Sequence, residues 1–597
     1  MKKILFILGV LFAELFAQEV VQVPEWAKTA VWYQIFPERF RNGDATNDPT
    51  PHDLKGGWPY ELPPDWQISD WTGDWYEFQS WEKNWSDDFY RVAGTRRYGG
   101  DIQGVIDKLD YLAELGITAI YFNPLFESPS LHKYDATMYR HIDNNFGPNP
   151  KLDEKIWERE IPDDPATWRW TSADSLFLRL IREAHARGMK IIIDGVFNHV
   201  GATFWAFEDV KRNGEKSKYK DWFYIKRFDD PNTPQNEFDY QGWYGVKDLP
   251  ELKEDENGLI EPIKKHIFNI VKRWGDPNGD GNPEDGIDGW RLDVADMVNI
   301  RFWKEFRNAV KSVNPDAYLT GEVWWENWSE NKMFNASPWL DGTTFDAVMN
   351  YRFARAIKRF VADEKLGINS RAFADSLRAQ YSDYAWQNIL VLMNLLDSHD
   401  TERFASITVN PDHFYDHNAN PQQNPNWRVR KPNAIERAKQ KLAVALQMTL
   451  PGAPMIYYGD EAGMWGGDDP DDRKPMLWKE FDYAAETHHP YGKKRPADSV
   501  KFDENLFDWY KRLIALRKKK TALSLGTIKF IESENPNSVI FLRENGNEKL
   551  LVCANKSGKE IKLELLEKEF TNARIIFGTT ENPNSLAPYE LKVFEVR

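Results

Sequence analysis

The chain of 597 residues is longer than one hydrophobic core normally covers, so we expect a large domain with smaller parts attached. Its formal net charge of −16 argues against nucleic acid or an anionic membrane surface as a partner. The single cysteine, Cys553, excludes a disulfide framework within the chain and a cysteine-rich metal site. The 26 tryptophans are unusual, and we interpret them as a mixture of core residues and flat apolar platforms suited to sugar rings.

Residues 1–17 have the pattern of a signal peptide. Lys2 and Lys3 precede an apolar run, and Ala17 is a small residue at the expected cleavage site. The run is too short to be a good membrane span, so we expect no membrane attachment after processing. The alternative is an ordinary buried N-terminal segment. The pattern therefore predicts a secreted or periplasmic protein.

Residues 25–520 alternate buried strands with amphipathic helices. Strands are expected at 29–40, 116–124, 189–196, 287–294, 317–324, 346–351, 389–396 and 454–458. Helices are expected near 102–115, 173–187, 300–312 and 433–448. About eight strands in this alternation predict an α/β fold, a (β/α)8 TIM barrel. Residues 200–285 interrupt the alternation and predict an inserted subdomain after the third strand.

From about residue 523 the pattern changes to short strands without helices between them. Apolar strand segments begin at Ser538, Lys549, Ile561 and Leu591. Residues 523–597 are therefore expected to form a C-terminal antiparallel β-sandwich.

Carboxylates lie at the ends of four of the expected barrel strands, at Asp194, Asp293, Glu322 and Asp400. Barrels of this kind have their active sites at the carboxyl ends of the strands. Arg291 lies two residues before Asp293, so both side chains point the same way on a strand, and we expect Arg291 to hold Asp293 ionised. Taken alone, an Arg–Asp pair that serves only the fold is an equal alternative.

Two carboxylates that flank a glycosidic bond can divide acetal hydrolysis into two easier steps. We interpret Asp293 as the nucleophile and Glu322, beside Trp324, as the proton donor to the leaving oxygen. Asp400 would hold substrate hydroxyls and support the oxocarbenium-like charge. Further candidates for substrate contact are Tyr134, His199 and His399. Acid clusters in barrels also bind metals for other chemistries, such as isomerisation, and these residues alone leave that alternative open.

Four motifs, taken together and in order, resemble the α-amylase family of glycoside hydrolases. They are residues 194–199, 289–293, 321–324 and 398–400. The resemblance implies that Asp293 is the nucleophile, Glu322 the acid/base and Asp400 the transition-state stabiliser. It also implies a set of substrate contacts, namely His132, Tyr134, His199, Arg291, Trp324, His399, Asp469 and Arg473.

Within that family the chain is most similar to the neopullulanase and cyclomaltodextrinase branch, in residues 132–135, 204–210 and 249–253. Lys253 stands where that branch usually has Asn. Members of the branch often carry an N-terminal β-domain that builds a dimer. Here the barrel pattern begins close to the predicted leader, so a monomer with an open cleft is expected.

The resemblance implies a secreted retaining hydrolase that cleaves α-1,4 glucosidic bonds in starch, maltodextrins, pullulan or cyclodextrins, and it leaves α-1,6 bonds open as a further candidate. One alternative is a 4-α-glucanotransferase or cyclodextrin glucanotransferase of the same architecture. Another is a catalytically inactive glucan-binding protein, against which the presence of all three acids argues.

Two loops are rich in the oxygen ligands that Ca2+ prefers. Residues 42–48, with Gly99 and Asp101, resemble the calcium site of cyclodextrin glucanotransferases. The loop from Asp276 begins like an EF-hand, but Ile287 stands where the twelfth-position Glu would be. The alternatives are a polar turn and a solvated acidic loop without metal. The predicted calcium ligands are Asn42, Asp44, Asn47, Asp48, Gly99 and Asp101 in one loop, and Asp276, Asn278 and Asp280 in the other.

Overall fold

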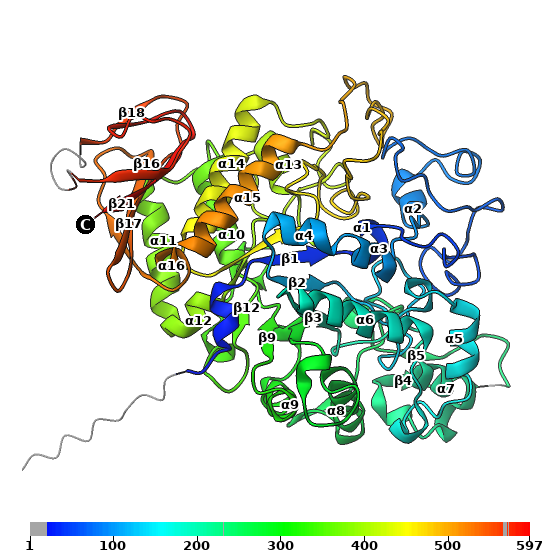
Figure 1. Ribbon diagram of the computed structural model, residues 1–597. Coiled ribbons are helices and arrows are strands. Elements are labelled where there is room, and N and C mark those ends of the chain that lie inside the picture. The colour runs from blue at the N-terminus through cyan, green and yellow to red at the C-terminus, as the bar shows by residue number, and fades with distance from the viewer. Residues whose placement is uncertain (1–20, 231, 565–569, 571, 597) are drawn as a thin grey trace, which may run out of the picture.

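Eight parallel strands form a closed barrel at the centre of the molecule (Figure 1). The computed structural model describes residues 21–230, 232–564, 570 and 572–596, so the predicted signal peptide lies outside the described residues. The barrel strands are β1 (Trp32–Ile35), β2 (Ala119–Phe122), β3 (Lys190–Gly195), β8 (Gly289–Leu292), β9 (Tyr318–Gly321), β12 (Ala347–Val348), β13 (Met393–Asn394) and β14 (Ala453–Tyr457). The predicted TIM barrel is confirmed.

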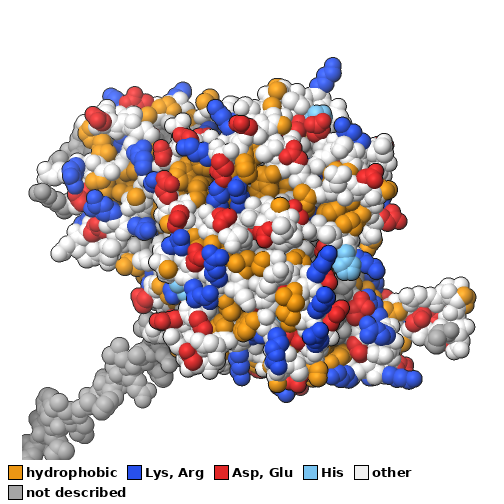
Figure 2. All heavy atoms as spheres, turned by 45° about the vertical axis from the view of Figure 1, so that its right-hand side comes forward, with side chains coloured by type: hydrophobic (Ala, Val, Ile, Leu, Met, Phe, Trp, Pro, Cys, Tyr) orange, Lys and Arg blue, Asp and Glu red, His pale blue; other side chains and the backbone are white. Residues whose placement is uncertain are grey.

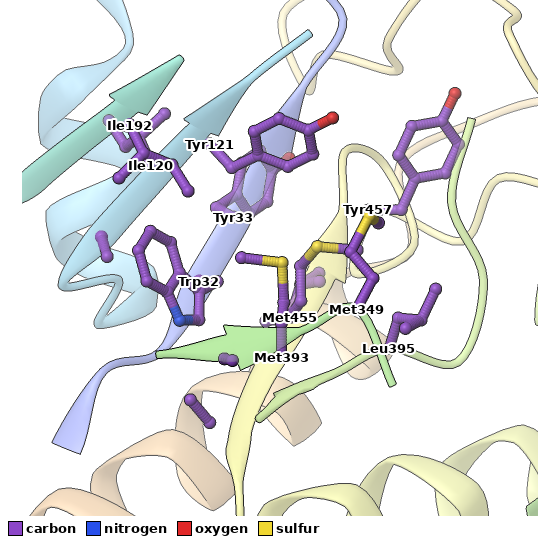
Figure 3. Packing of buried hydrophobic residues seen from close by; sticks show 14 of the residues in the cluster. Trp32, Tyr33, Ile120, Tyr121, Ile192, Met349, Met393, Leu395, Met455 and Tyr457 are labelled. Atoms are coloured by element: carbon purple, nitrogen blue, oxygen red, sulfur yellow. The ribbon is translucent and has the colours of Figure 1, made fainter. Parts of the chain in front are cut away.

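Neighbouring strands in the barrel follow the order β12-β9-β8-β3-β2-β1-β14-β13. A parallel bridge between Met349 and Met393 joins the two ends of this order and closes the barrel. Side chains such as Trp32, Ile192 and Met455 fill the interior (Figure 3). Because helices cover the outside, the strands are buried on both faces and read as continuous apolar runs.

The helices around the barrel follow the expected alternation. They include α6 (Ser172–Ala186), α8 (Glu261–Gly275), α9 (Ile300–Val313), α11 (Ser370–Asp383), α14 (Ala434–Thr449) and α15 (Glu504–Lys519). The helix expected over 102–115 is divided into α3 (Ile102–Asp107) and α4 (Leu109–Leu115), which meet at Lys108.

The prediction of a strand over residues 389–396 is wrong for most of that range. Helix α12 (Trp386–Val391) occupies the first part of that range, and β13 is only two residues long. Ile389 and Val391 are buried within the helix. A short, fully buried apolar run has the same appearance in a helix as in a strand, so its periodicity does not distinguish them.

Two long insertions lie at the end of the barrel toward which β1 points (Figure 1). The first follows β1 and contains α2 (Phe89–Ala93). The second follows β3 and precedes α8. It contains α7 (Trp205–Asn213) and two hairpins, β4 (Ile225–Arg227) with β5 (Asp239–Tyr240), and β6 (Glu254–Asp255) with β7 (Gly258–Leu259).

The C-terminal region forms antiparallel sheets beside α14, α15 and α16 (Thr521–Ser524) (Figure 1). A five-stranded sheet has the order β15 (Thr527–Ile531), β16 (Ser538–Asn545), β17 (Glu548–Asn555), β21 (Leu591–Val596) and β19 (Arg574–Phe577). A two-stranded sheet pairs β18 (Ile561–Lys562) with β20 (Ser585–Leu586). The predicted antiparallel C-terminal domain is therefore confirmed.

On the face that Figure 2 presents, acidic and basic side chains are interspersed, with hydrophobic side chains in small groups between them. This face shows no broad basic surface of the kind that binds nucleic acid. Among the described residues, no helix combines the length and the apolar character that crossing a bilayer requires.

Candidate active site

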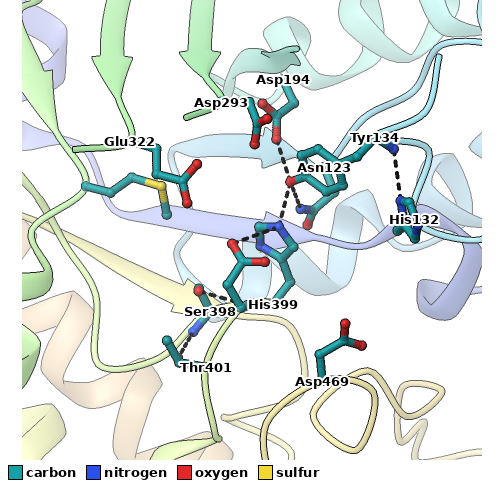
Figure 4. A network of polar contacts seen from close by, with 12 residues as sticks. Asn123, His132, Tyr134, Asp194, Asp293, Glu322, Ser398, His399, Thr401 and Asp469 are labelled. Carbon is teal, nitrogen blue, oxygen red and sulfur yellow. Dashed lines mark hydrogen bonds and ion pairs between the residues drawn. The ribbon is translucent and has the colours of Figure 1, made fainter. Parts of the chain in front are cut away.

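The carboxyl ends of neighbouring parallel strands bring the predicted acids together. Asp194 lies at the end of β3. Asp293 directly follows β8, and Glu322 directly follows β9. Asp400 follows β13 after a short loop. In Figure 4, Asp194, Asp293 and Glu322 face a common space across from His399. Residues up to 206 positions apart therefore meet at one face of the barrel, as Asp194 and Asp400 do.

Arg291 lies at the centre of this group and is fully buried. Its Nη1 lies 3.0 Å from both carboxylate oxygens of Asp194 and 2.8 Å from Asp293 Oδ1. Its Nη2 lies 2.9 Å from Glu322 Oε2 and 4.0 Å from Asp400 Oδ2. One guanidinium therefore faces four carboxyl groups, and it holds Asp293 and Glu322 side by side.

The excess of carboxyl groups governs their protonation. Burial raises the pKa of Asp293 well above its usual range; Arg291 lowers it, and the neighbouring Glu322 raises it again. Burial, with a further contribution from Glu322, raises the pKa of Asp400 to about 8. The expectation that Arg291 alone keeps Asp293 ionised is therefore incomplete, because several carboxylates share one cation in a buried site. Such a cluster retains protons that acid–base chemistry can use.

Tyr134 forms part of the opposite wall, and its ring stacks at 5.4 Å on the ring of His399, which is buried behind it (Figure 4). The Tyr134 hydroxyl donates to Asp194 Oδ2 at 2.9 Å. Gln34 Nε2 donates to Nδ1 of His399, so the ring proton lies on Nε2, which faces Tyr134 and Asp400. Burial lowers the pKa of His399 well below its usual range, and the ring is a neutral donor.

His199 and His132 are also neutral, because burial lowers the pKa of each to about 3. Nε2 of His199 is buried without a hydrogen-bond partner, so it is free for a ligand hydroxyl, and its ring stacks on Trp243 at 5.2 Å. His132 Nδ1 accepts the backbone N–H of Tyr134. The sequence-predicted histidines are thus gathered around the acids.

The remaining predicted contacts lie on the rim. Arg473 Nε donates to the carbonyl of His399, and its guanidinium lies 3.4 Å from Asp400 and 3.1 Å from Asp469. Trp324 stacks on Tyr351 with ring centroids 4.1 Å apart. Six of the eight predicted substrate contacts line one cleft of about 590 Å³. The other two, Arg291 and His399, are buried behind its surface.

The cleft also has lining residues that the sequence analysis missed. These are Trp243, Tyr244, Leu249, Val294, Asp296, Met297, Trp325, Trp328 and Asp416. Asp296 could have been predicted as a cleft residue from the sequence, because it lies three residues after Asp293. Trp243 begins a short 3-10 helix, and Trp328 and Asp416 lie in turns. For the tryptophans, only their general abundance in the sequence gave any signal.

The first predicted calcium loop has features that fit a cation. Asn47 Oδ1 is buried without a partner, and burial raises the pKa of Asp48 to about 6. Gly99 has φ +72°, and a Cβ there would lie 2.1 Å from Asp48 Oδ1, so only glycine fits beside this carboxylate. Asp101 instead accepts bonds from the backbone of Gly43, residue 44 and residue 104, so its oxygens hold the loop and begin α3.

In the second loop, Asp276 accepts the N–H groups of Gly279 and Gly281, and Asp280 accepts that of Asn282. Asp285 Oδ1 is buried without a partner. Within the described ranges, no three His, Cys, Asp or Glu side chains come together as metal ligands. Either loop would therefore depend on amide and backbone oxygens for much of its ligand set.

The alpha amylase catalytic-domain model matches residues 34–160 and 172–526. The chain belongs to the alpha-amylase family. It is 37% identical over 550 residues to neopullulanase 2 of Thermoactinomyces vulgaris, covering 92% of this chain and 73% of that protein. It is 34% identical to a cyclomaltodextrinase of Geobacillus thermopakistaniensis, over 91% of this chain and 71% of the relative.

Solved structures of this family agree with the fold. The ligand-free cyclic α-maltosyl-(1→6)-maltose hydrolase from Arthrobacter globiformis matches with a TM-score of 0.68 and 27% identity, over 96% of this chain and 100% of that one. The type III pullulan hydrolase from Thermococcus kodakarensis matches with a TM-score of 0.71 and 27% identity, over 96% and 83% of the two chains. As a member of the alpha-amylase family, close to its neopullulanase and cyclomaltodextrinase branch, the chain is a glycosidase.

Proposed function

We propose that the chain is a retaining hydrolase of α-1,4 and also α-1,6 glucosidic bonds in starch, maltodextrins, pullulan or cyclodextrins. The observation that carries this proposal is the pairing of Asp293 and Glu322 with the two terminal nitrogens of Arg291, at 2.8 and 2.9 Å. Retaining glycosidases need two adjacent carboxyl groups, one as nucleophile and one as acid/base.

Asp293 would attack the anomeric carbon while Glu322 protonates the leaving oxygen, which gives a covalent glycosyl–enzyme intermediate. Glu322 would then take a proton from the water that releases the sugar. Asp400, with His399 and His199, would hold ring hydroxyls of the sugar on the nucleophile, and Tyr134 would stack beneath it. Arg291 would orient both acids.

Variants of the two acids test this assignment with an α-maltosyl fluoride substrate, whose leaving group needs no protonation. Asp293→Asn should lower kcat on maltodextrins and on the fluoride by at least about 10³-fold. Glu322→Ala should lose about 10²–10⁴-fold in kcat/KM on maltodextrins but much less in kcat/KM on the fluoride, because cleavage of the fluoride needs no proton from Glu322. Added azide should restore turnover of Glu322→Ala and yield an α-glycosyl azide.

The control is Glu326→Gln, a partly exposed position four residues after the proposed acid/base, which should keep normal turnover. Near-normal turnover of Asp293→Asn, or an azide product of inverted configuration from Glu322→Ala, would refute the assignment. Thin-layer chromatography of products from starch, pullulan and cyclodextrin then distinguishes hydrolysis from transfer, because a glucanotransferase would give cyclic or elongated glucans.

We also propose that residues 1–17 direct secretion, that the enzyme is a monomer, and that the two predicted loops bind Ca2+. The support for secretion is the basic and apolar pattern of the leader. One relative, from Bacillus subtilis, is an intracellular maltogenic amylase, 33% identical over 95% of this chain and 75% of its own length. The location of this enzyme therefore depends on its own leader.

A further inference from the structure

A second hollow of about 450 Å³ opens beside the catalytic cleft. Four residues line both spaces, namely His132, Leu249, Asp469 and Arg473, so the two spaces adjoin. We call the second space the distal lobe. Its further lining includes Trp58, Tyr90, Gly94, Val246, Asp248 and Gln422. Its volume lies within the range that ligand-binding pockets commonly have.

The distal lobe lies on the side of the cleft away from the proposed acid/base. Arg473, on the shared wall, contacts Asp400 at 3.4 Å. Glu322 instead accepts the backbone N–H of Val294 at 2.8 Å, and neither of these two residues lines the lobe. Because Glu322 would protonate the leaving oxygen, glucosyl units in the lobe belong to the part that stays on Asp293. That part is the non-reducing side of the scissile bond.

Among the described residues that line the lobe, only Trp58 has a large aromatic ring that is well exposed, with 52% of its surface exposed. Its ring lies directly on the backbone of Gly94, where a Cβ would be 2.1 Å from Trp58 Cζ3. Gly94 has φ −63°, a conformation that any residue adopts. The close approach of the indole is therefore the physical reason for glycine there, and the backbone supports one face of the ring.

Buried polar contacts hold the chain next to Gly94, on which the ring of Trp58 lies. Arg96 and Glu82 are buried and form two parallel ion-pair contacts of 2.8 Å. Such paired contacts fix both position and orientation. The indole N–H of Trp66 donates to the carbonyl of Thr95 at 2.9 Å. These contacts hold residues 95 and 96, which follow Gly94, so they fix the backbone on which the indole of Trp58 lies.

A direct contact ties this segment to the insertion after β3. The Tyr60 hydroxyl donates to Asp248 Oδ1, and burial with the Asp248 charge raises the pKa of Tyr60, so the hydroxyl stays a donor. Asp248, the acceptor in this contact, is one of the residues that line the lobe. The lining combines aromatic surface with the polar side chains of Asp248 and Gln422, which suits the apolar faces and the hydroxyl groups of a neutral sugar.

We infer that the distal lobe binds further glucosyl units on the non-reducing side of the scissile bond, with the exposed indole of Trp58 stacked on one of them. This inference rests on the proposed hydrolysis of α-glucans, and it adds longer linear glucans as the preferred class of substrate. Linear glucans long enough to reach Trp58 are better substrates than short ones, because they bind both the cleft and the lobe.

The test compares Trp58→Ala with the unchanged enzyme on maltoheptaose and on α-maltosyl fluoride, which is too short to reach the lobe. The variant should lower kcat/KM for maltoheptaose about tenfold, mainly through a higher KM. Its turnover of the fluoride should change less than about twofold. Trp58→Phe keeps a ring and should lose only about two- to threefold on maltoheptaose. The matched control is Trp85→Ala, in the same segment but outside both cavities, which should behave as the unchanged enzyme.

Equal losses on both substrates would overturn the inference, because they would assign Trp58 a structural role. Unchanged kcat/KM for maltoheptaose would also overturn it. Failure of the proposed function is a separate result, since the unchanged enzyme would then hydrolyse neither substrate. If Trp58→Ala folds poorly by its thermal melt, Trp58→Phe and direct binding of maltoheptaose to Glu322→Gln decide the question.

Discussion

At the scale of single residues, one guanidinium group organises the carboxylates of the cleft. Arg291 contacts Asp194, Asp293 and Glu322 within 3.0 Å while its own side chain is fully buried. A buried cation of this kind is expensive unless its partners surround it. Its role is therefore to fix the geometry of the acids more than to neutralise them.

Val294 is a second residue whose conformation bears on the site. It has φ +37°, which a β-branched side chain rarely adopts, and its N–H donates to Glu322. Strained residues persist where the surrounding structure determines them, often at functional sites. The turn after β8 thus holds Glu322 in place with a backbone donor.

The raised pKa of Asp400 predicts a pH-dependent stability. Folded Asp400 has a pKa of about 8, against about 3.9 in an unfolded chain. Between these values the folded state holds a proton that the unfolded state releases, so this contribution to stability falls as pH rises from about 4 to about 8. Asp400→Asn removes the effect. Its Tm should match that of the unchanged enzyme near pH 4 and exceed it by roughly 1–3 °C at pH 9.

Because 28% of the Asp400 side chain is exposed, the gain should be smaller than for a fully buried carboxyl group. Thermal melts at several pH values measure it, and Asp508→Asn, at an exposed position on α15, is the control. A Tm difference that does not grow with pH would show that burial does not govern this carboxyl group. The same variant should lose at least about 10²-fold in kcat.

At the scale of elements, the contact between β8 and β9 positions both proposed catalytic acids. Gly289 begins β8, pairs with Tyr318 of β9, and has φ +152°. A Cβ at this position would lie 1.9 Å from the carbonyl oxygen of Tyr318. The glycine therefore allows the two strands to approach closely enough to place Asp293 beside Glu322.

Gly289→Ala should destabilise the barrel by about 2–3 kcal/mol, because the strands must separate to admit the methyl group. The matched control is Gly188→Ala, which also has positive φ, +73°, but meets nothing within 4 Å. It should cost only about 1–2 kcal/mol for the left-handed backbone. Denaturant unfolding curves compare the two variants. Equal losses would indicate that backbone conformation, and not the contact with Tyr318, is decisive.

At the scale of the whole molecule, regions distant in the sequence are joined by buried polar contacts. Arg543 of β16 is buried and donates to the carbonyls of Thr449, Gly526 and Thr527. Thr449 is the last residue of α14, so this side chain attaches the C-terminal sheet to a barrel helix. Buried carbonyls need such donors, and the contact therefore favours one fixed arrangement of the two parts.

Calcium would act at the same scale, because the first loop joins the chain after β1 to the start of α3. If Asn47 Oδ1 and Asp48 bind Ca2+, a chelator should lower the Tm and added Ca2+ should restore it, since binding to the folded state alone adds stability. Mg2+ should restore less, because it favours a smaller and more regular site. Asn47→Ala should reduce the chelator effect. An equal Tm in chelator and in excess Ca2+ would contradict the calcium proposal.

The barrel, the antiparallel C-terminal domain and the candidate acids could all be predicted from the amino-acid sequence. Continuous apolar runs and helical periodicity are local properties, so they are visible without coordinates. The acids at 194, 293, 322 and 400 were found because each follows a run of this kind, and parallel strands bring such positions to one face. The two-residue strand β13 was misjudged because a short buried run has no periodicity of its own.

Only the tertiary structure decided what surrounds these acids. Trp243 reaches the cleft from a short 3-10 helix, and Trp328 and Asp416 reach it from turns. Trp58 lines the distal lobe because Gly94, 36 positions later, admits its ring. The sharing of Arg291 among four carboxyl groups likewise depends on distances between strands. Loop conformations and contacts between remote residues leave no periodic pattern in a sequence, because they arise from packing of the whole chain.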